Sequence, residues 1–237
     1  MAMASCMFER PHHRRIAQLL SSLDADFLLA CGCYFGGGTA IVLMLDEYRE
    51  SLDVDFLCSS QDGYRALRNT ITNASLGAML RAPVELAREV RADRYGIRTF
   101  VKVDGVAVKF EVVSEGRIAV AGGMNARLGV PVLSREDMYA EKLLANADRW
   151  GDKSALSRDL IDLALMIQHW GIIPAAAWDK ARLAYGQSID VAYDKALGLI
   201  ADPAYLAACL QKMHMDQGLV ARIPDLLQRA RPGQTAV

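Results

Sequence analysis

Apolar positions along the chain follow two different periods, and these periods predict the elements of the fold. After Pro11, apolar residues recur at the 3.6-residue spacing of an amphipathic helix that ends before Asp24. Residues 27–34 form an apolar run that predicts a buried strand. Residues 62–80 again show helical spacing. The first half of the chain is therefore expected to mix strands and helices.

A glycine turn and an alternating strand follow the run at residues 27–34. Gly36, Gly37 and Gly38 allow positive φ and close approach of a ligand to the backbone, and Thr39 stands where a helix N-cap is expected. Residues 52–58 then alternate with period two, which predicts a strand. This alternation puts Asp53 and Asp55 on one face and Leu52, Val54 and Phe56 on the other.

A β-hairpin is the clearest local signal of the chain. Asp104-Gly105 favours a type I′ turn between strands at residues 99–103 and 106–113. On the second strand Lys109 and Glu111 share one face, opposite Val108, Phe110 and Val112. The arginine-rich stretch before it, residues 81–98, is interleaved with acids and is interpreted as a solvated helix face, with tracking of an RNA backbone as the lesser alternative.

From Ser134 onward the pattern becomes helical. Ser134 and Asp137 resemble a capping box that opens a helix at residues 138–150, and a second helix at residues 156–170 ends at Gly171. Glycines and prolines divide the remainder into short helices. We therefore predict an α+β fold: a small mixed or antiparallel sheet with flanking helices in a domain at residues 1–130, then a helical bundle at residues 131–237.

Amino-acid composition and net charge exclude few classes of protein. The 237 residues are 52% hydrophobic, enough to build a core, and 27 basic against 28 acidic side chains leave a net charge of -1. This net charge gives no overall positive field of the kind that indicates a nucleic-acid-binding protein. The five cysteines form no CxxC pattern and are interpreted as reduced thiols of a cytoplasmic protein. No apolar run approaches the roughly 20 residues of a membrane span, so no membrane partner is expected.

The candidate chemistry begins with the carboxylates. Asp53 and Asp55 side by side repel each other unless water or a cation screens them, and such oxygen ligands suit Mg²⁺ or Mn²⁺. If Glu111 lies on a neighbouring strand and faces the same way, three carboxylates converge. One or two metal ions held there would bridge the phosphates of a nucleoside triphosphate (NTP) and promote nucleotidyl transfer. Gly37, Gly38 and Thr39 would then donate hydrogen bonds to the phosphates.

Gly-Gly-Thr, Asp-x-Asp on a strand and Lys-x-Glu on a later strand resemble the polymerase β-like nucleotidyltransferase superfamily. Two later segments narrow the resemblance to the AbiEii/AbiGii-type nucleotidyltransferase toxin family: Met138–Arg149, which contains Lys142, and the Arg-Asp-x-x-Asp-Leu run at residues 158–163. The resemblance covers residues 27–165. The triple glycine and the acidic Asp46-Glu47 in the following loop depart from the family pattern.

The resemblance implies roles for residues at matching positions. It implies a catalytic set of Asp53, Asp55, Lys142 and Asp159, with Lys142 on the nucleotide phosphates. Further nucleotide contacts are expected from Gly37, Gly38, Thr39, Arg158 and Asp162, and metal ligands from Asp53 and Asp55. Glu111 is not uniformly part of the family's catalytic set, so its expected role as a third metal ligand rests on strand geometry. Asp159 and Asp162 lie on nearly the same helical face, so the sequence does not separate their roles.

Each of these features also has an ordinary structural explanation. The glycines alone make a tight turn, alternating acids are usually a solvated strand face, and Arg158 with Asp162 would form an exposed i,i+4 ion pair. Glu111 beside Lys109 suits an exposed hairpin face. Only the joint occurrence of the motifs favours a nucleotide site.

The sequence hypothesis is a Mg²⁺-dependent, ATP- or other NTP-using nucleotidyltransferase. It would be the toxin of a toxin–antitoxin or phage-defence pair, with the 3′ end of tRNA as a candidate acceptor and an antitoxin as a partner. Two alternatives stay open: transfer to a small molecule such as an aminoglycoside, for which Asp46 and Glu47 would suit a cationic acceptor, and a catalytically silent nucleotide-binding module of the same fold.

Overall fold

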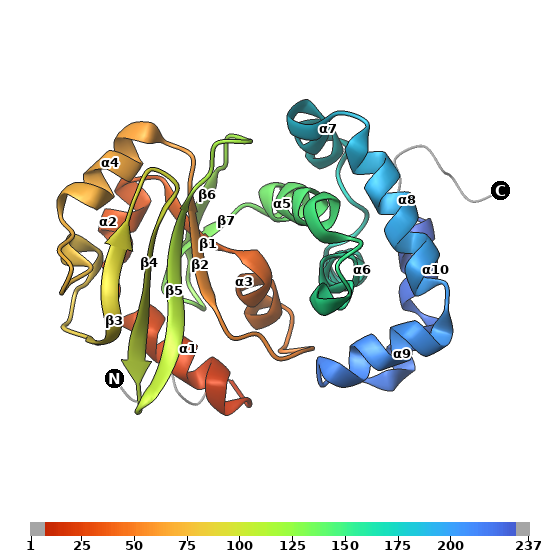
Figure 1. Ribbon diagram of the computed structural model, residues 1–237, viewed down its shortest axis with the longest axis horizontal. Coiled ribbons are helices and arrows are strands. Elements are labelled where there is room, and N and C mark those ends of the chain that lie inside the picture. Colours follow the sequence, from red (N-terminus) through yellow and green to blue (C-terminus); the bar gives the residue numbers. More distant parts are fainter. Residues whose placement is uncertain (1–7, 231–237) are drawn as a thin grey trace. The chain divides into compact units, whose positions relative to one another are not determined.

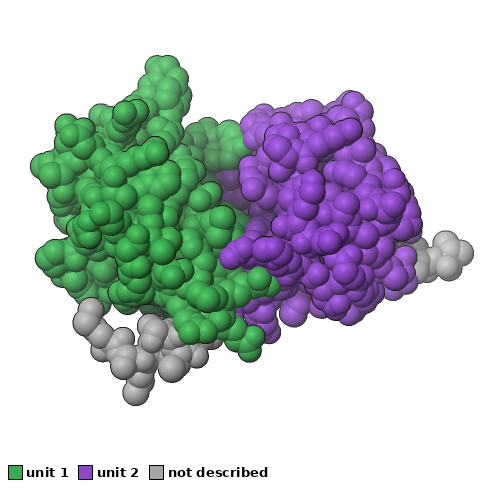
Figure 2. All heavy atoms as spheres, turned by 60° about the horizontal axis from the view of Figure 1, so that its bottom comes forward, with its two compact units in different colours: residues 1–43, 51–134 green, residues 44–50, 135–237 purple. Residues whose placement is uncertain are grey.

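The computed structural model describes residues 8–230, so the predictions for Cys6 and for a frayed tail at residues 231–237 lie outside it. Two compact units divide the chain (Figure 2). The sheet unit comprises Met1–Leu43 and Ser51–Ser134, and the helical unit comprises Met44–Glu50 and Arg135–Val237. The chain thus leaves the sheet unit for the short segment 44–50, returns, and leaves again after Ser134. The division into domains at residues 1–130 and 131–237 stays a prediction.

The sheet unit is built on one mixed sheet of seven strands in the order β3-β4-β5-β2-β1-β7-β6 (Figure 1). Parallel pairs join β2 to β5 and β1 to β7, and the other neighbours are antiparallel. In chain order the strands are β1 Cys33–Gly36, β2 Val54–Cys58, β3 Glu85–Ala92, β4 Gly96–Val103, β5 Val106–Ser114, β6 Gly122–Asn125 and β7 Val130–Leu133.

Within the described residues, four α-helices belong to the part of the chain that builds the sheet. Helix α1 contacts β4, α2 contacts β1 and β7, and α4 contacts β2. The helices are α1 Pro11–Ser21, α2 Ala25–Ala30, α3 Gly37–Met44 and α4 Gln61–Asn69, with a 3₁₀ turn η1 at Gly77–Met79. Phe35, Phe56 and Phe110 are fully buried, with ring centroids 5.4 Å and 5.8 Å apart along the series. Burial of these rings anchors the central strands.

The helical unit packs around long helix α5. Helix α5 contacts α6, α7 and α8, and α10 contacts α6 and α8. The helices are α5 Arg135–Arg149, α6 Arg158–Trp170, α7 Ala175–Tyr185, α8 Ser188–Ile200, α9 Pro203–Lys212 and α10 Ile223–Gln228, with 3₁₀ turns η2 Lys153–Ala155 and η3 Gln217–Ala221. Trp178 and Tyr193 are fully buried in an edge-to-face pair with centroids 5.1 Å apart. Gly171 ends α6 with φ 95, as predicted.

Three predicted elements are wrong. The apolar run at residues 27–34 is a short helix, α2, capped by the Asp24 side chain, followed by a turn into β1. Helix α4 stops at Asn69 instead of continuing to residue 80. The arginine-rich stretch forms β3 and part of β4 instead of a helix. The Asp24 cap accounts for the first difference, and the pairing of β3 with β4 accounts for the third.

The predicted fold class and the hairpin are confirmed. The fold is α+β, and β4 and β5 pair through Val103 and Val106 across a turn in which Asp104 and Gly105 have φ 49 and φ 76. Positive φ at both turn residues is the mark of a type I′ turn. The described cysteines Cys31, Cys33, Cys58 and Cys209 are free, buried thiols. Within residues 8–230 no helix is both long and apolar enough to cross a membrane.

Candidate functional site

The glycine turn lies between β1 and α3. Gly37 has φ 68, a conformation that side chains with a Cβ adopt only under strain, and it is the first residue of α3. A Cβ at Gly37 would lie 3.1 Å from Asp55 Oδ2. Gly36 pairs with Asp55 in the β1–β2 register. The turn therefore brings the backbone at the start of a helix directly against one of the predicted carboxylates.

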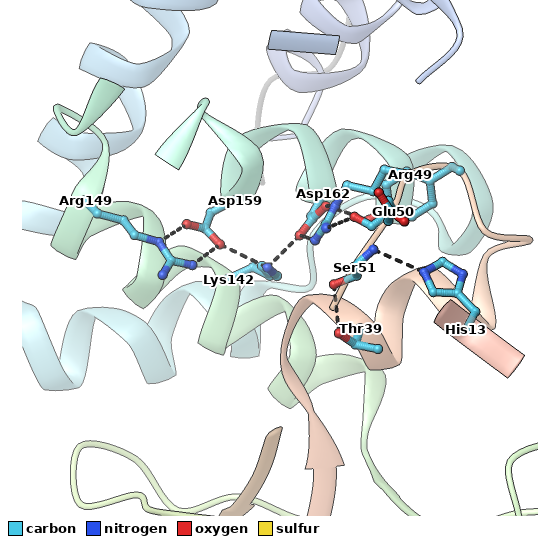
Figure 3. A network of polar contacts seen from close by, with 10 residues as sticks. His13, Thr39, Arg49, Glu50, Ser51, Lys142, Arg149, Asp159 and Asp162 are labelled. Atoms are coloured by element: carbon cyan, nitrogen blue, oxygen red, sulfur yellow. Dashed lines mark hydrogen bonds and ion pairs between the residues drawn. The ribbon is translucent and has the colours of Figure 1, made fainter. Parts of the chain in front are cut away.

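Thr39 lies within the first turn of α3, so it is not the predicted N-cap. Its side chain is buried, and its hydroxyl is 2.7 Å from the hydroxyl of Ser51. The backbone N–H of Ser51 in turn donates to His13 Nε2 at 3.1 Å (Figure 3). These contacts fix the start of the segment that leads into β2. A nucleotide contact from Thr39 stays a prediction.

Asp53 and Asp55 occupy the more open side of β2 and the residue before it. Both are half-buried, while Val54 and Phe56 are fully buried on the opposite face. Asp55 pairs with Glu111 in the parallel β2–β5 register, so the two residues project from the same face of the sheet. The neighbouring-strand position expected for Glu111 is thus the one observed.

Both carboxylate oxygens of Glu111 are engaged by cations. Arg98 Nε donates to Oε1 at 2.6 Å, and Lys109 Nζ lies 2.7 Å from Oε2. Burial opposes ionisation of Glu111, but these hydrogen bonds and charges lower its pKa overall. Among the residues that the structure describes, no group of three or more His, Cys, Asp or Glu side chains is placed to hold a metal ion. A metal-ligand role for Glu111 stays a prediction.

Lys109 carries positive charge beside the aspartate pair. Partial burial works against its charged form, yet the hydrogen bond to Glu111 and the charges of Glu111, Asp55 and Asp53 raise the pKa of Lys109. Lys109 therefore stays protonated at neutral pH and offsets part of the negative charge of this face.

The predicted residues of the helical unit form a buried ionic network. Lys142 on α5 is buried, and its Nζ lies 2.9 Å from Asp159 Oδ1 and 2.6 Å from Asp162 Oδ2 on α6. Figure 3 shows the ammonium group between the two carboxylates. Arg149 extends the network with two hydrogen bonds to Asp159, of 2.6 and 2.8 Å. Asp159 and Asp162 thus share the Lys142 ammonium group, and Arg149 is a second cation for Asp159.

Two residues that the sequence analysis missed complete this network. Arg49 donates from Nε and Nη2 to Asp162 at 2.7 and 2.8 Å, and the Tyr48 hydroxyl donates to Asp162 Oδ1 at 2.6 Å. Burial disfavours the Asp162 carboxylate, but Arg49 and Lys142 hold its pKa well below the usual range. A fully buried aspartate requires cationic partners, and this requirement was the one available signal for Arg49.

Arg158 differs from its predicted partners. It is exposed at the first position of α6, whereas Asp162 is fully buried against Arg49 and Lys142. The exposed i,i+4 pair considered for Arg158 and Asp162 is therefore replaced by a buried network from other elements. A phosphate contact from Arg158 stays a prediction.

A comparison with protein-family models identifies the family of this chain. The family model described as "Nucleotidyl transferase AbiEii toxin, Type IV TA system" matches residues 18–228. The chain belongs to the AbiEii nucleotidyltransferase toxin family. The match extends the resemblance of residues 27–165 through nearly the whole helical unit of this AbiEii chain. No curated protein matches it.

One solved structure supports the fold of the AbiEii chain, and a second is reported with it. A putative nucleotidyltransferase from Helicobacter pylori has a TM-score of 0.52 at 15% sequence identity, covering 96% of this chain and 95% of that one. An antigenic nucleotidyltransferase-like protein from Paracoccidioides brasiliensis has a TM-score of 0.48 at 15% identity, covering 89% and 97%. The first likeness shows a shared fold with a nucleotidyltransferase-like protein.

Proposed function

We propose that this AbiEii family member transfers a nucleotide from an NTP to an acceptor hydroxyl in a reaction that depends on Mg²⁺ or Mn²⁺. One observation carries the proposal: the half-buried pair Asp53 and Asp55 lies on an otherwise apolar strand, with Asp55 against the positive-φ turn at Gly37. A solvated strand face needs neither an adjacent turn that favours glycine nor two neighbouring carboxylates.

The aspartate pair fits the ligand preference of Mg²⁺. This ion is usually bound by one or two carboxylates together with waters and substrate phosphates, instead of a complete protein cage. Asp53 and Asp55 would hold it, and waters and substrate phosphates would complete its ligands. When bound, the ion would neutralise phosphate charge and lower the pKa of the attacking hydroxyl.

The chain's own residues would bind and orient the triphosphate. Gly37 and Gly38 open α3, whose first backbone N–H groups have no partner within the helix and suit an anion. Lys109, held protonated by Glu111 and the aspartates, would add a cation next to the carboxylates. Glu111 would position Lys109 and Arg98.

Family membership alone supports a catalytic or nucleotide-binding role for Lys142, Asp159, Asp162 and Arg158. Lys142 already donates to two buried carboxylates, so replacing it leaves uncompensated charge and destabilises the helical unit. A Lys142→Met variant should therefore be compared with wild type in nucleotide affinity and in unfolding midpoint. Lower affinity, measured under conditions where both proteins are fully folded, would support a nucleotide contact, and an equal affinity would refute it.

The biological setting follows from the family description. A type IV toxin–antitoxin family implies a cognate antitoxin, and we propose an RNA 3′ end, such as that of tRNA, as the acceptor. Each α-³²P-labelled NTP should be incubated with the protein, Mg²⁺ or Mn²⁺, and either tRNA or an aminoglycoside. Label on the RNA is the expected result. Label on the aminoglycoside would establish the small-molecule alternative, and a folded protein without metal-dependent NTP binding would establish the silent module.

A further inference from the structure

The charged side chains of the sheet face are arranged in rows that cross four strands. One row runs from Asp55 on β2 to Glu111 on β5, then to Arg98 on β4 and Arg91 on β3, because each residue is the register partner of the next. The face therefore changes from carboxylates at its centre to guanidinium groups at its edge.

A second row, two residues along β5 and β4 from the first, carries positive charge at both ends. Lys109 pairs with Phe100 on β4, and Phe100 pairs with Arg88 on β3. The Arg88 guanidinium lies over the Phe100 ring, 4.6 Å from its centroid. We name the group Arg88, Arg91, Arg98 and Phe100 the arginine face.

Bulges in the edge strand bring Arg88 and Arg91 to the same side. Residues three apart in a regular strand face opposite ways, yet Arg88 and Arg91 pair with Phe100 and Arg98, which are two apart and share a face. The register shifts between Leu86 and Arg88 and between Arg88 and Arg91 make this possible. Bulges of this kind re-aim side chains and are frequent next to active sites.

The arginine face lines a groove that suits an anion. The groove has a volume of about 420 Å³ and is lined by Arg88, Glu89, Arg91, Arg98, Thr99 and Phe100. Within residues 8–230 neither Arg88 nor Arg91 makes an ion pair with a carboxylate, and both are exposed. Arg91 also lies directly opposite Arg98, a like-charge pair that an anionic ligand would stabilise.

The lining favours phosphodiester groups over an acidic protein. Protein interfaces place apolar and aromatic anchors at their centre, but this groove has no aliphatic lining residue and its one ring is covered by Arg88. Arginine forks match the geometry of phosphate oxygens.

We propose that the arginine face binds the phosphodiester backbone of a nucleic-acid acceptor, a few nucleotides upstream of its reacting 3′ hydroxyl. The inference rests on the proposed function, because the carboxylates of β2 define where the 3′ end lies. Three strand spacings separate β2 from β3, about 14 Å in all, which is the length of a few nucleotides. The inference therefore requires a polymeric acceptor, because a small-molecule acceptor would not reach from the carboxylates to the arginine face.

The test measures binding without NTP or metal, so that it does not depend on catalysis. A fluorescent single-stranded RNA of ten nucleotides is titrated by anisotropy against wild type, the double variant Arg88→Gln/Arg91→Gln, and a matched control, Arg229→Gln, which removes an exposed arginine of the helical unit. A decamer of glutamate serves as the acidic-peptide probe.

Two lost phosphate contacts should lower the slope of log Kd against log salt by about 1.4, since each contact to a single strand contributes about 0.7. At 0.1 M salt the same contacts correspond to roughly 25-fold weaker binding. Arg229→Gln should bind like wild type. Neutral methylphosphonate linkages a few positions from the 3′ end should weaken wild-type binding and leave the double variant unaffected.

An unchanged slope in the double variant, or tighter binding of the glutamate decamer than of RNA, would overturn the inference. If labelled nucleotide is transferred to RNA equally by wild type and double variant, the proposed function stands and the arginine face is irrelevant to it. If RNA binds through the arginines but no nucleotide is ever transferred, the binding surface stands and the proposed function fails.

Discussion

Replacing Arg49 with methionine tests the buried network of the helical unit. Arg49 and Asp162 have side-chain exposures of 6% and 0%, and two hydrogen bonds of 2.7 and 2.8 Å join them. Removing one partner of a buried pair costs about 3 to 5 kcal/mol because the other charge is left buried. Asp162 would keep Lys142 and Tyr48, so we expect a loss near the lower limit, about 3 kcal/mol.

Arg182 offers a matched control within the same unit. It also makes two hydrogen bonds to one carboxylate, to Asp190 at 2.9 and 2.8 Å, but the two side chains are 39% and 30% exposed. An ion pair of this exposure contributes about 1 kcal/mol or less. Arg182→Met should therefore cost far less than Arg49→Met, although the bonding geometry is the same.

Urea unfolding followed by tryptophan fluorescence measures the difference. All three tryptophans, Trp150, Trp170 and Trp178, belong to the helical unit, so the signal reports its unfolding. The free energy of unfolding should fall about 3 kcal/mol for Arg49→Met and by no more than about 1 kcal/mol for Arg182→Met. Equal losses in the two variants would refute the account of segment 44–50 as part of this core.

Three further predictions concern single side chains. Because the folded-state pKa of Asp162 lies below its unfolded value of about 3.9, its stabilisation is present above that pH and is lost as the pH falls. In unfolding followed by fluorescence, Asp162→Asn should be less stable than wild type at pH 7 and should lose less stability than wild type as the pH falls. Gly37→Ala should cost about 1 to 2 kcal/mol and reduce nucleotide transfer, whereas Gly123→Ala, in open space, should do neither in the same two assays. Glu111→Gln should leave the Mg²⁺ concentration for half-maximal transfer unchanged, and a tenfold rise would make Glu111 a metal ligand.

Short-range patterns predicted the parts of the fold that depend on local geometry. Asp104-Gly105 specified a turn with two positive φ angles, and the alternation through Asp55 specified which strand face is buried. The apolar run at residues 27–34 failed because the Asp24 cap selects a short helix before the strand begins. Apolar runs of this length do not distinguish strand from helix by periodicity alone.

The sequence predicted those site residues whose role follows from their residue type. It did not predict the contacts that depend on strand pairing or on distant parts of the chain. Asp53 and Asp55 were recognised as a pair, but nothing local indicated that both oxygens of Glu111 would be engaged by Arg98 and Lys109. The role of Arg49 depends on a carboxylate more than a hundred positions away. The arginine face depends on bulges, which sequence periodicity does not reveal.

We propose that Asp55 on β2 and Asp53 just before it catalyse nucleotide transfer. The most direct test of this proposal is the rate of transfer from an α-³²P-labelled NTP to RNA by wild type and by Asp55→Asn, which keeps the shape of the side chain and removes its charge. With equal unfolding midpoints, we predict that the variant loses at least a hundredfold in rate, on the order of a lost electrostatic contact to the transition state. Transfer by Asp55→Asn at the wild-type rate would contradict the account.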